Sequence, residues 1–208
     1  MRNWLDDKEA YRNRYYRGLQ EHASKYMVFG SEIAKGLEDK SIIIPGLVQY
    51  PVQEYQCTVE VDGIPFFAYV DQYWPEKFKF REIKTGSMRP GGAPRWTQQD
   101  VDDHMQLDIY SLLIQIKNGQ VDDECHLDWL KTRSKVKKFT DAWGNQLESQ
   151  SNEMELTGEL ESFARIISQD ERDRMRVLIK TVAAEIAADY ATFLLSSPAP
   201  VHPESPRS

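Results

Sequence analysis

The spacing of hydrophobic positions predicts helices at the start of the chain. Apolar residues recur at helical spacing over residues 5–24, and a second helix is predicted over residues 27–39. In the first of these, arginines alternate with tyrosines: Tyr11, Arg12, Arg14, Tyr15, Tyr16 and Arg17. The favoured interpretation is a solvated face over a core stripe. The alternative is a helix that stacks bases and pairs with phosphates.

From residue 41 the pattern becomes typical of strands. Residues 41–84 are rich in β-branched and aromatic side chains, and glycines and prolines interrupt them. Asp62-Gly63 separates two short apolar runs and predicts a hairpin turn. A further strand is predicted from Phe78 to Lys84. We expect these strands to form an antiparallel meander.

The second half of the chain alternates between helical and strand-like patterns. The predicted elements are a Gly/Pro-rich loop over 85–97, a helix over 98–118 that ends at Gly119, a strand over 126–131, a turn at 143–145 and a strand over 159–167. Ser168 and Glu171 fit a capping box that begins a long helix. Residues 1–195 are expected to form a single domain, with a helical N-terminal part over 1–40. A disordered tail is expected over 196–208, which holds four prolines.

Composition narrows the class of protein. The chain has 208 residues with 40% hydrophobic content, which is enough for a globular core. Its net charge of −7 argues that the surface is not broadly basic, as a nucleic-acid-binding surface often is. A local basic channel remains compatible with that charge. No apolar run reaches the roughly 20 residues of a membrane-spanning helix, and the N-terminus lacks the apolar core of a signal peptide, so we expect a cytoplasmic protein without a membrane partner. Cys57 and Cys125 are expected to be buried, small apolar residues.

Three charged residues carry the candidate chemistry. Alternate residues of a strand share a face, so Glu82 and Lys84 point the same way, and Asp71 can join them if the strands pair through the turn between them. Such a trio beside apolar strands is costly unless it is paired or binds a cation, and its oxygen ligands suit Mg²⁺ or Mn²⁺. The backbone carbonyl of Ile83 can add a further oxygen. A Glu-x-Lys tripeptide alone is common, and by itself it indicates an exposed ion pair.

Four motifs in order give that trio a context. Gly30 and Glu32 lie in the second predicted helix, and Asp71 ends a strand. Glu82-Ile83-Lys84-Thr85-Gly86 follows, and the later helix carries Gln106 and Tyr110, which share one face because they are four residues apart. In this order and spacing, residues 27–132 resemble the RecB-like branch of the PD-(D/E)XK nucleases. The likeness is greatest to small phage-type and CRISPR-associated exonucleases.

The resemblance implies a fold, an activity and a site. The fold would be a mixed α/β (α+β) restriction-endonuclease-like core, with a central mixed sheet of four to five strands flanked by helices. The activity would be Mg²⁺- or Mn²⁺-dependent hydrolysis of DNA, most simply as an exonuclease acting on single-stranded or duplex ends. An endonuclease of the same fold and a catalytically silent nucleic-acid-binding adaptor are the alternatives. Phage recombination, repair and CRISPR spacer processing, each with a possible protein partner, stay open.

The resemblance also implies residue roles. The catalytic residues would be Asp71, Glu82, Lys84, Gln106 and Tyr110. The metal ligands would be Asp71, Glu82, the carbonyl of Ile83, and Glu32, which stands where many members carry histidine. The cysteines that bind an iron–sulfur cluster in several relatives are absent, so no such cluster is expected. For Gln106 and Tyr110 the alternative is ordinary helix packing.

Basic and aromatic residues around the expected site are candidates for DNA contacts. They are Arg89, Arg95, Trp96, His104, Arg133 and Lys135, the last two in a basic segment from Lys131 to Lys138. For each of them a solvated side chain is an equally good interpretation. Glu54, just before the strands, is a weaker candidate for the acidic site.

Overall fold

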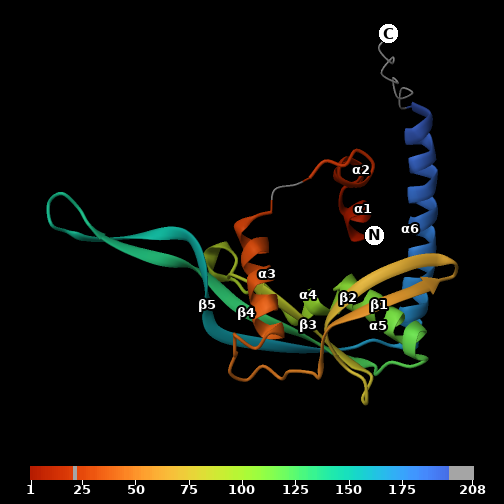
Figure 1. Cartoon of the computed structure of the whole chain (residues 1–208), viewed down its shortest axis with the longest axis horizontal. Helices are drawn as coiled ribbons and strands as arrows, with labels where there is room; N and C mark the ends of the chain where they lie inside the picture. The colour runs from red at the N-terminus through yellow and green to blue at the C-terminus, as the bar shows by residue number, and fades with distance from the viewer. Residues whose placement is uncertain (21–22, 197–208) are drawn as a thin grey trace, which may run out of the picture. The chain divides into compact units, whose positions relative to one another are not determined.

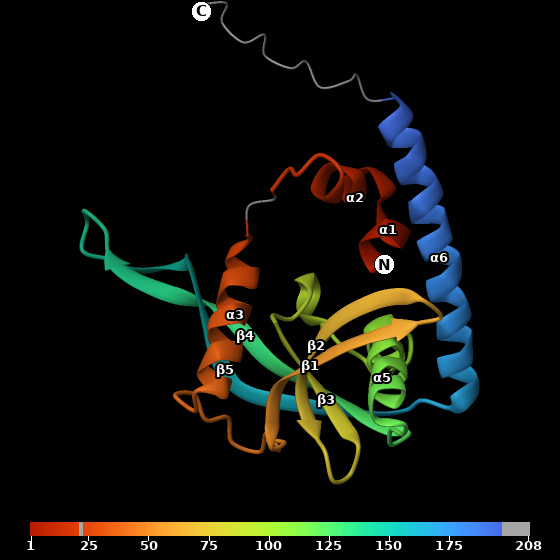
Figure 2. The same cartoon turned by 45° about the vertical axis from the view of Figure 1, so that its right-hand side comes forward.

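The computed structural model describes residues 1–20 and 23–196 (Figures 1 and 2). The chain divides into two compact units, which we describe separately. The first comprises residues 1–20 together with the chain from Val177 onward, and the second comprises residues 21–176. The tail expected over 196–208 falls, from residue 197 on, outside the described residues.

A five-stranded mixed sheet forms the second unit. Its strands are β1 (Val52–Val61), β2 (Ile64–Trp74), β3 (Lys79–Gly86), β4 (Glu124–Thr140) and β5 (Gln146–Ile166), and they lie in sequence order. Only β3 and β4 pair in parallel; the other pairs are antiparallel. The predicted meander and the mixed sheet are thus both confirmed. Asp62 and Gly63 connect β1 to β2 with positive φ values of 52° and 81°, the backbone that a two-residue hairpin turn needs.

The parallel pairing of β3 and β4 requires a crossover, and helices supply it. After a short 3₁₀ turn (η1, Pro90–Gly92), the crossover contains α4 (Gln98–Asp102) and α5 (Met105–Asn118). The prediction of one continuous helix over 98–118 is therefore wrong, because the chain breaks at Asp103 and His104. Arg165 of β5 stabilises the break by donating to the carbonyls of Val101 and His104, at 3.2 and 3.1 Å.

Helices cover both faces of the sheet. The first of them, α3 (Lys25–Glu38), packs its Ile33 and Leu37 into a core cluster with Leu130 and Ile83. Gly36 allows a close approach there, since a Cβ at this position would lie 2.4 Å from Cδ1 of Ile42. Figures 1 and 2 show α3 lying across the β4–β5 side of the sheet. The second helix, α5, contacts the opposite face and packs against β1.

Strands β4 and β5 extend far beyond the sheet as a two-stranded arm, visible in Figure 1. The predicted strands over 126–131 and 159–167 were too short, because they ignored the charged residues that follow and precede them. Those charges face one another across the arm: Arg133 pairs with Glu155 at 2.7 Å, and Lys135 with Glu153 at 3.1 Å. Cross-strand ion pairs of this kind support pairing where no core exists.

The first unit is held together by aromatic and ionic contacts. It contains α1 (Arg2–Asp6), α2 (Lys8–Tyr15) and the part of α6 (Gln169–Ser196) from Val177 onward. Tyr16 packs against Tyr190 and Phe193 with ring centroids 4.8 and 5.3 Å apart, and Arg12 pairs with Asp189. These contacts agree with a solvated face over a core stripe. The prediction of a continuous helix over 5–24 is wrong at Asp7, which takes an extended backbone, ends α1 and caps α2 through Ala10 N.

Other predictions concern single residues. Cys57 and Cys125 are buried and unpaired, as expected. Ser168 and Glu171 form the predicted capping box at the start of α6: Glu171 N donates to Ser168 Oγ at 3.3 Å, and Ser168 N donates to Glu171 Oε2 at 2.7 Å. In the described part of the chain, no helix is both long and apolar enough to cross a membrane.

Candidate active site

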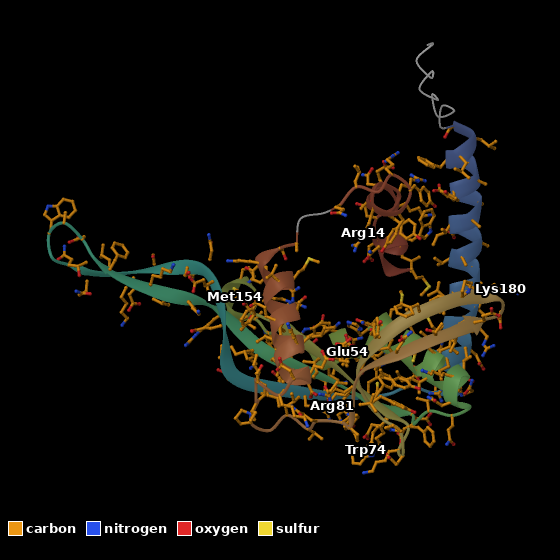
Figure 3. All side chains as sticks on the ribbon, in the orientation of Figure 1. Arg14, Glu54, Trp74, Arg81, Met154 and Lys180 are labelled. Carbon is orange, nitrogen blue, oxygen red and sulfur yellow. The ribbon has the colours of Figure 1, made fainter. Side chains whose placement is uncertain are left out.

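Two carboxyl groups meet where β2 and β3 separate. The last ladder pair on that side joins Gln72 to Arg81, so Asp71 and Glu82 are the next residues on the two strands. Asp71 Oδ2 accepts a hydrogen bond of 2.7 Å from the backbone N–H of Ile83. Figure 3 labels Arg81, the residue before Glu82, within the sheet of the second unit. The hairpin geometry thus brings Asp71 beside Glu82, an arrangement that the sequence left conditional on the pairing of these two strands.

Burial sets the electrostatics of this pair. Glu82 is only 2% exposed, and burial, followed by the nearby negative charge of Asp71, raises its pKa to about 8. Burial also raises the pKa of Asp71, while the N–H of Ile83 and the charge of Lys84 act in the opposite direction. Two buried carboxylates side by side disfavour double ionisation. The pair is therefore costly as two anions unless positive charge compensates it.

A hydrogen-bonded chain of side chains extends from Glu82 to α5. The Lys84 ammonium group pairs with Glu82 Oε1 and donates a hydrogen bond of 2.8 Å to Gln106 Oε1. Gln106 Nε2 in turn donates to the hydroxyl of Tyr110 at 2.5 Å. Tyr110 is buried with its ring edge-on to Phe80, at 6.3 Å between centroids. The structure brings together the five residues proposed as catalytic. Tyr110 packs in the core and is also the last member of this series of hydrogen-bonded side chains.

A cavity of about 480 Å³ opens beside the carboxyl pair. Asp71, Ile83, Lys84 and Thr85 form its floor, and α3 forms one wall. Gly30 lies close to that floor: a Cβ there would be 3.1 Å from Thr85 Oγ1. The glycine noted in the sequence thus permits the close approach of α3 to β3.

The acidic residues of the cavity differ from the expected set. Glu32, the carboxylate expected where relatives carry histidine, is exposed and does not line the cavity. Glu38 does line it, because it lies about two turns after Gly30 on the same side of α3. Glu54 lines it as well and is labelled in Figure 3. Its pKa is raised by burial and by the charges of Asp71 and Glu38.

Glu54 also has an unusual backbone. The ladder pairs on either side, Gln53 with Gln72 and Tyr55 with Val70, place it opposite Asp71, yet it has a φ of 50° at the third residue of β1. Left-handed backbone at a non-glycine residue costs on the order of 1–3 kcal/mol and is concentrated at functional sites. No local sequence signal indicates this distortion; the sequence offered Glu54 only as a weaker candidate for the acidic site, because it lies close to the predicted strands.

The donor set fits a divalent cation. Glu82 Oε2 is buried without a hydrogen-bond partner, which leaves one carboxylate oxygen available beside Asp71. Two carboxylates and a backbone carbonyl are hard oxygen ligands of the kind that Mg²⁺ and Mn²⁺ prefer. Over residues 1–20 and 23–196, no three His, Cys, Asp or Glu side chains are grouped closely enough to hold an ion by themselves. Water or substrate oxygens would have to complete the coordination.

The residues proposed to contact DNA are scattered. Arg133 and Lys135 lie on the arm in ion pairs, and Arg89 pairs with Asp100 at 3.1 Å. His104 is buried at the start of α5, with Trp96 packed on it at 5.0 Å between ring centroids. Arg95 is exposed and has no ion-pair partner in the described chain. Of the six, Arg95 is the one whose charge is both exposed and uncompensated.

Comparison with known proteins gives a fold but no family. No protein-family description matches the sequence, and no curated protein matches it either. Among solved structures, the chain is similar to a phage-related exonuclease from Haemophilus somnus 129PT, with a TM-score of 0.51 and 12% identity, covering 88% of this chain and 81% of that one. It also aligns with SSO0001 at a TM-score of 0.43 and 16% identity, covering 97% of this chain and 81% of that chain. The mixed sheet flanked by helices is consistent with the restriction-endonuclease-like fold expected from the sequence.

Proposed function

We propose that this chain is a nuclease that hydrolyses phosphodiester bonds of DNA with the help of a divalent cation. One observation carries the proposal: a buried carboxylate oxygen of Glu82 has no hydrogen-bond partner and lies beside Asp71 and Lys84, which both line the cavity. The similar Haemophilus structure is that of a phage-related exonuclease, which supports the same class of reaction. An exonuclease acting on DNA ends is the form we propose.

Each residue has a role in that reaction. Asp71, Glu82 and the carbonyl of Ile83 would hold Mg²⁺ or Mn²⁺, and a cation bound there supplies positive charge at the scissile phosphate and lowers the pKa of a water. Lys84 orients the attacking water and offsets negative charge that develops on the phosphate. Gln106 positions the Lys84 ammonium, and Tyr110 holds Gln106. Glu38 and Glu54 add negative charge on the cavity side, where a second cation would be attracted.

The test is a cleavage assay with end-labelled DNA. Single-stranded, duplex and closed circular DNA, together with an RNA strand, are incubated with Mg²⁺, Mn²⁺ or chelator. We expect the wild type to cleave linear DNA only when a cation is present, and to leave closed circles intact. Lys84→Ala and Asp71→Asn should each lose at least about a hundredfold in rate, the usual scale for removing one electrostatic or proton-transferring group.

Matched controls lie in the turn between β2 and β3. Glu76 and Lys77 are exposed there and lie outside the cavity. Glu76→Gln and Lys77→Ala remove the same kinds of charge as the active-site variants, and both should cleave DNA like the wild type. Cleavage that survives both Lys84→Ala and Asp71→Asn would contradict the proposal. Cutting of closed circles would identify an endonuclease, and binding of DNA without cleavage under any condition would identify an adaptor.

A further inference from the structure

Two large aromatic side chains are exposed on the strand that carries Asp71. Phe67 and Tyr69 of β2 are 58% and 46% exposed, and their rings meet edge-to-face at 4.9 Å between centroids. Alternate residues of a strand share a face, so Phe67 and Tyr69 form one row, and Asp71 follows Tyr69 two residues later on the same strand. The row leads from the hairpin turn to the carboxyl pair.

The other face of the same hairpin is covered by packed side chains. Cys57, Val61 and Val70 are buried there, and Tyr55 stacks on Tyr73 at 4.1 Å between ring centroids. The sequence therefore places aromatic residues on both faces of the hairpin. Only the face with Cys57, Val61 and Val70 packs against the core, and the face with Phe67 and Tyr69 is left exposed. Exposed aromatic side chains gathered beside a candidate active site indicate a binding surface.

Residues opposite the row are suited to hydrogen bonding. Gln56 pairs in register with Tyr69, and Thr58 with Phe67. Gln56 Nε2 donates to Thr58 Oγ1 at 3.2 Å, and both residues are exposed. Each ring thus has an uncharged donor or acceptor across from it, which can meet the edge of a flat, polar ligand.

The flat rings and their spacing favour one class of ligand. The strands β1 and β2 contain no lysine or arginine, and Glu60 lies on the same face, so a nucleic acid would contact this face through its bases while its phosphates lie outside it. Residues two apart in a strand are about 6.6 Å apart, roughly twice the 3.4 Å spacing of stacked bases along a duplex strand. Only a single strand with its bases spread apart can place one base on each ring. Stacking of this kind tolerates any sequence, because every base has a flat π-face.

We propose that Tyr69 and Phe67 form a base-stacking subsite for single-stranded nucleic acid, which receives the nucleotides next to the scissile phosphate. The proposal rests on the proposed function, because the row is given direction by the carboxyl pair at its end. The nucleotide closest to Asp71 stacks on Tyr69, and the following one stacks on Phe67. Because of this subsite, the substrate is bound as a single strand next to the scissile phosphate.

The experiment removes the rings and keeps apolar volume. Phe67→Leu, Tyr69→Leu and the double variant are compared with the ring-preserving changes Phe67→Tyr and Tyr69→Phe. Phe139→Leu is the matched control, because Phe139 is 47% exposed on the arm. Steady-state kinetics on a single-stranded oligonucleotide with Mg²⁺ give KM and kcat, and melting curves check folding.

We expect KM to rise about tenfold for each ring removed, since one base–aromatic stack corresponds to roughly a factor of ten in affinity. The kcat of every variant should stay within about twofold of wild type. The KM of the ring-preserving variants and of Phe139→Leu should also stay within about twofold of wild type.

A second measurement does not depend on cleavage. Binding of the wild type to oligonucleotides carrying one 2-aminopurine is followed in chelator, with the fluorescent base moved along the strand. Quenching at two adjacent positions is expected, and its loss in Tyr69→Leu and Phe67→Leu supports the subsite. An unchanged KM in the double variant, or uniform fluorescence along the strand, would overturn it. If the wild type cleaves nothing, the proposed function fails, while ring-dependent quenching still decides the subsite by itself.

Discussion

Lys84 on β3 and Gln106 on α5 are joined by a hydrogen bond of 2.8 Å from Nζ to Oε1. The bond ties the helix of the crossover to the strand that precedes it. It also gives the Lys84 ammonium group a second acceptor besides Glu82, so its direction is defined by two partners. A lysine held in this way can present its remaining proton to the cavity.

The first prediction concerns Gln106 as a positioning residue. Gln106→Leu removes the acceptor for Lys84 and should lower kcat about tenfold, because one net hydrogen bond is worth on the order of 1 kcal/mol. Gln106→Glu keeps an acceptor oxygen and should restore most of the rate. Single-turnover cleavage of an end-labelled strand measures both variants. Equal losses in the two variants would mean that the contact with Lys84 is not what matters.

The second prediction concerns the cation. Glu82→Gln keeps the shape of the side chain but removes its charge, so cleavage should fall by at least about a hundredfold. At pH 9 in chelator, where Glu82 of the wild type is ionised, the melting temperature of the variant should equal or exceed that of the wild type, because the variant does not bury a carboxylate beside Asp71. Addition of Mn²⁺ should then raise the melting temperature of the wild type much more than that of the variant. A variant that is equally stabilised by Mn²⁺ would place the ion elsewhere.

The third prediction is the pH dependence of stability without metal. The pKa of Glu82 is raised from 4.5 to about 8 in the folded protein, so the folded state binds this proton more tightly than the unfolded chain does. The corresponding stability is fully present below pH 4.5, falls as the pH rises and is lost above about 8. In chelator, the wild type should therefore lose stability between pH 5 and 9 relative to Glu82→Gln. Urea unfolding of both proteins across this range measures the difference, and parallel curves would contradict the raised pKa.

The fourth prediction concerns the arm. Beyond Val136 its charged pairs are largely exposed, as in Lys138–Glu148, where the side chains are 74% and 60% exposed. Such pairs contribute about 0–1 kcal/mol each. Replacing residues 137–149 with Asn-Gly would close the register pair Val136–Gln150 with a two-residue turn. The melting temperature of the shortened protein should stay within a few degrees of wild type; a large fall would show that the arm stabilises the sheet.

Several features of the candidate site were predictable because they are local. The two-residue period of a strand placed Glu82 and Lys84 on one face, and the Asp-Gly turn predicted the β1–β2 hairpin. The four-residue spacing of Gln106 and Tyr110 placed them on one side of a helix, and their hydrogen bond follows from it. Each of these inferences needs only the geometry of a single element or of neighbouring elements.

Other features were decided by packing over long distances. The sequence offered Glu32 as a ligand, but the side of α3 that packs on β3 leaves Glu32 exposed and turns Glu38 to the cavity. The basic segment predicted for phosphates pairs with glutamates some 18 to 22 residues away on β5. These outcomes depend on which strands pair and in what register, which no local period encodes.

By itself, the sequence determined the types of the elements, the hairpin turn, the capping box of α6 and the shared face of the central charged residues. Those features follow from backbone preferences that act within a few residues. Only the tertiary structure decided that Asp71 meets Glu82, that a buried oxygen of Glu82 stays without a partner and that Phe67 and Tyr69 stay exposed. Burial and convergence arise when distant segments pack against one another, and the free energy of that packing is a property of the whole fold.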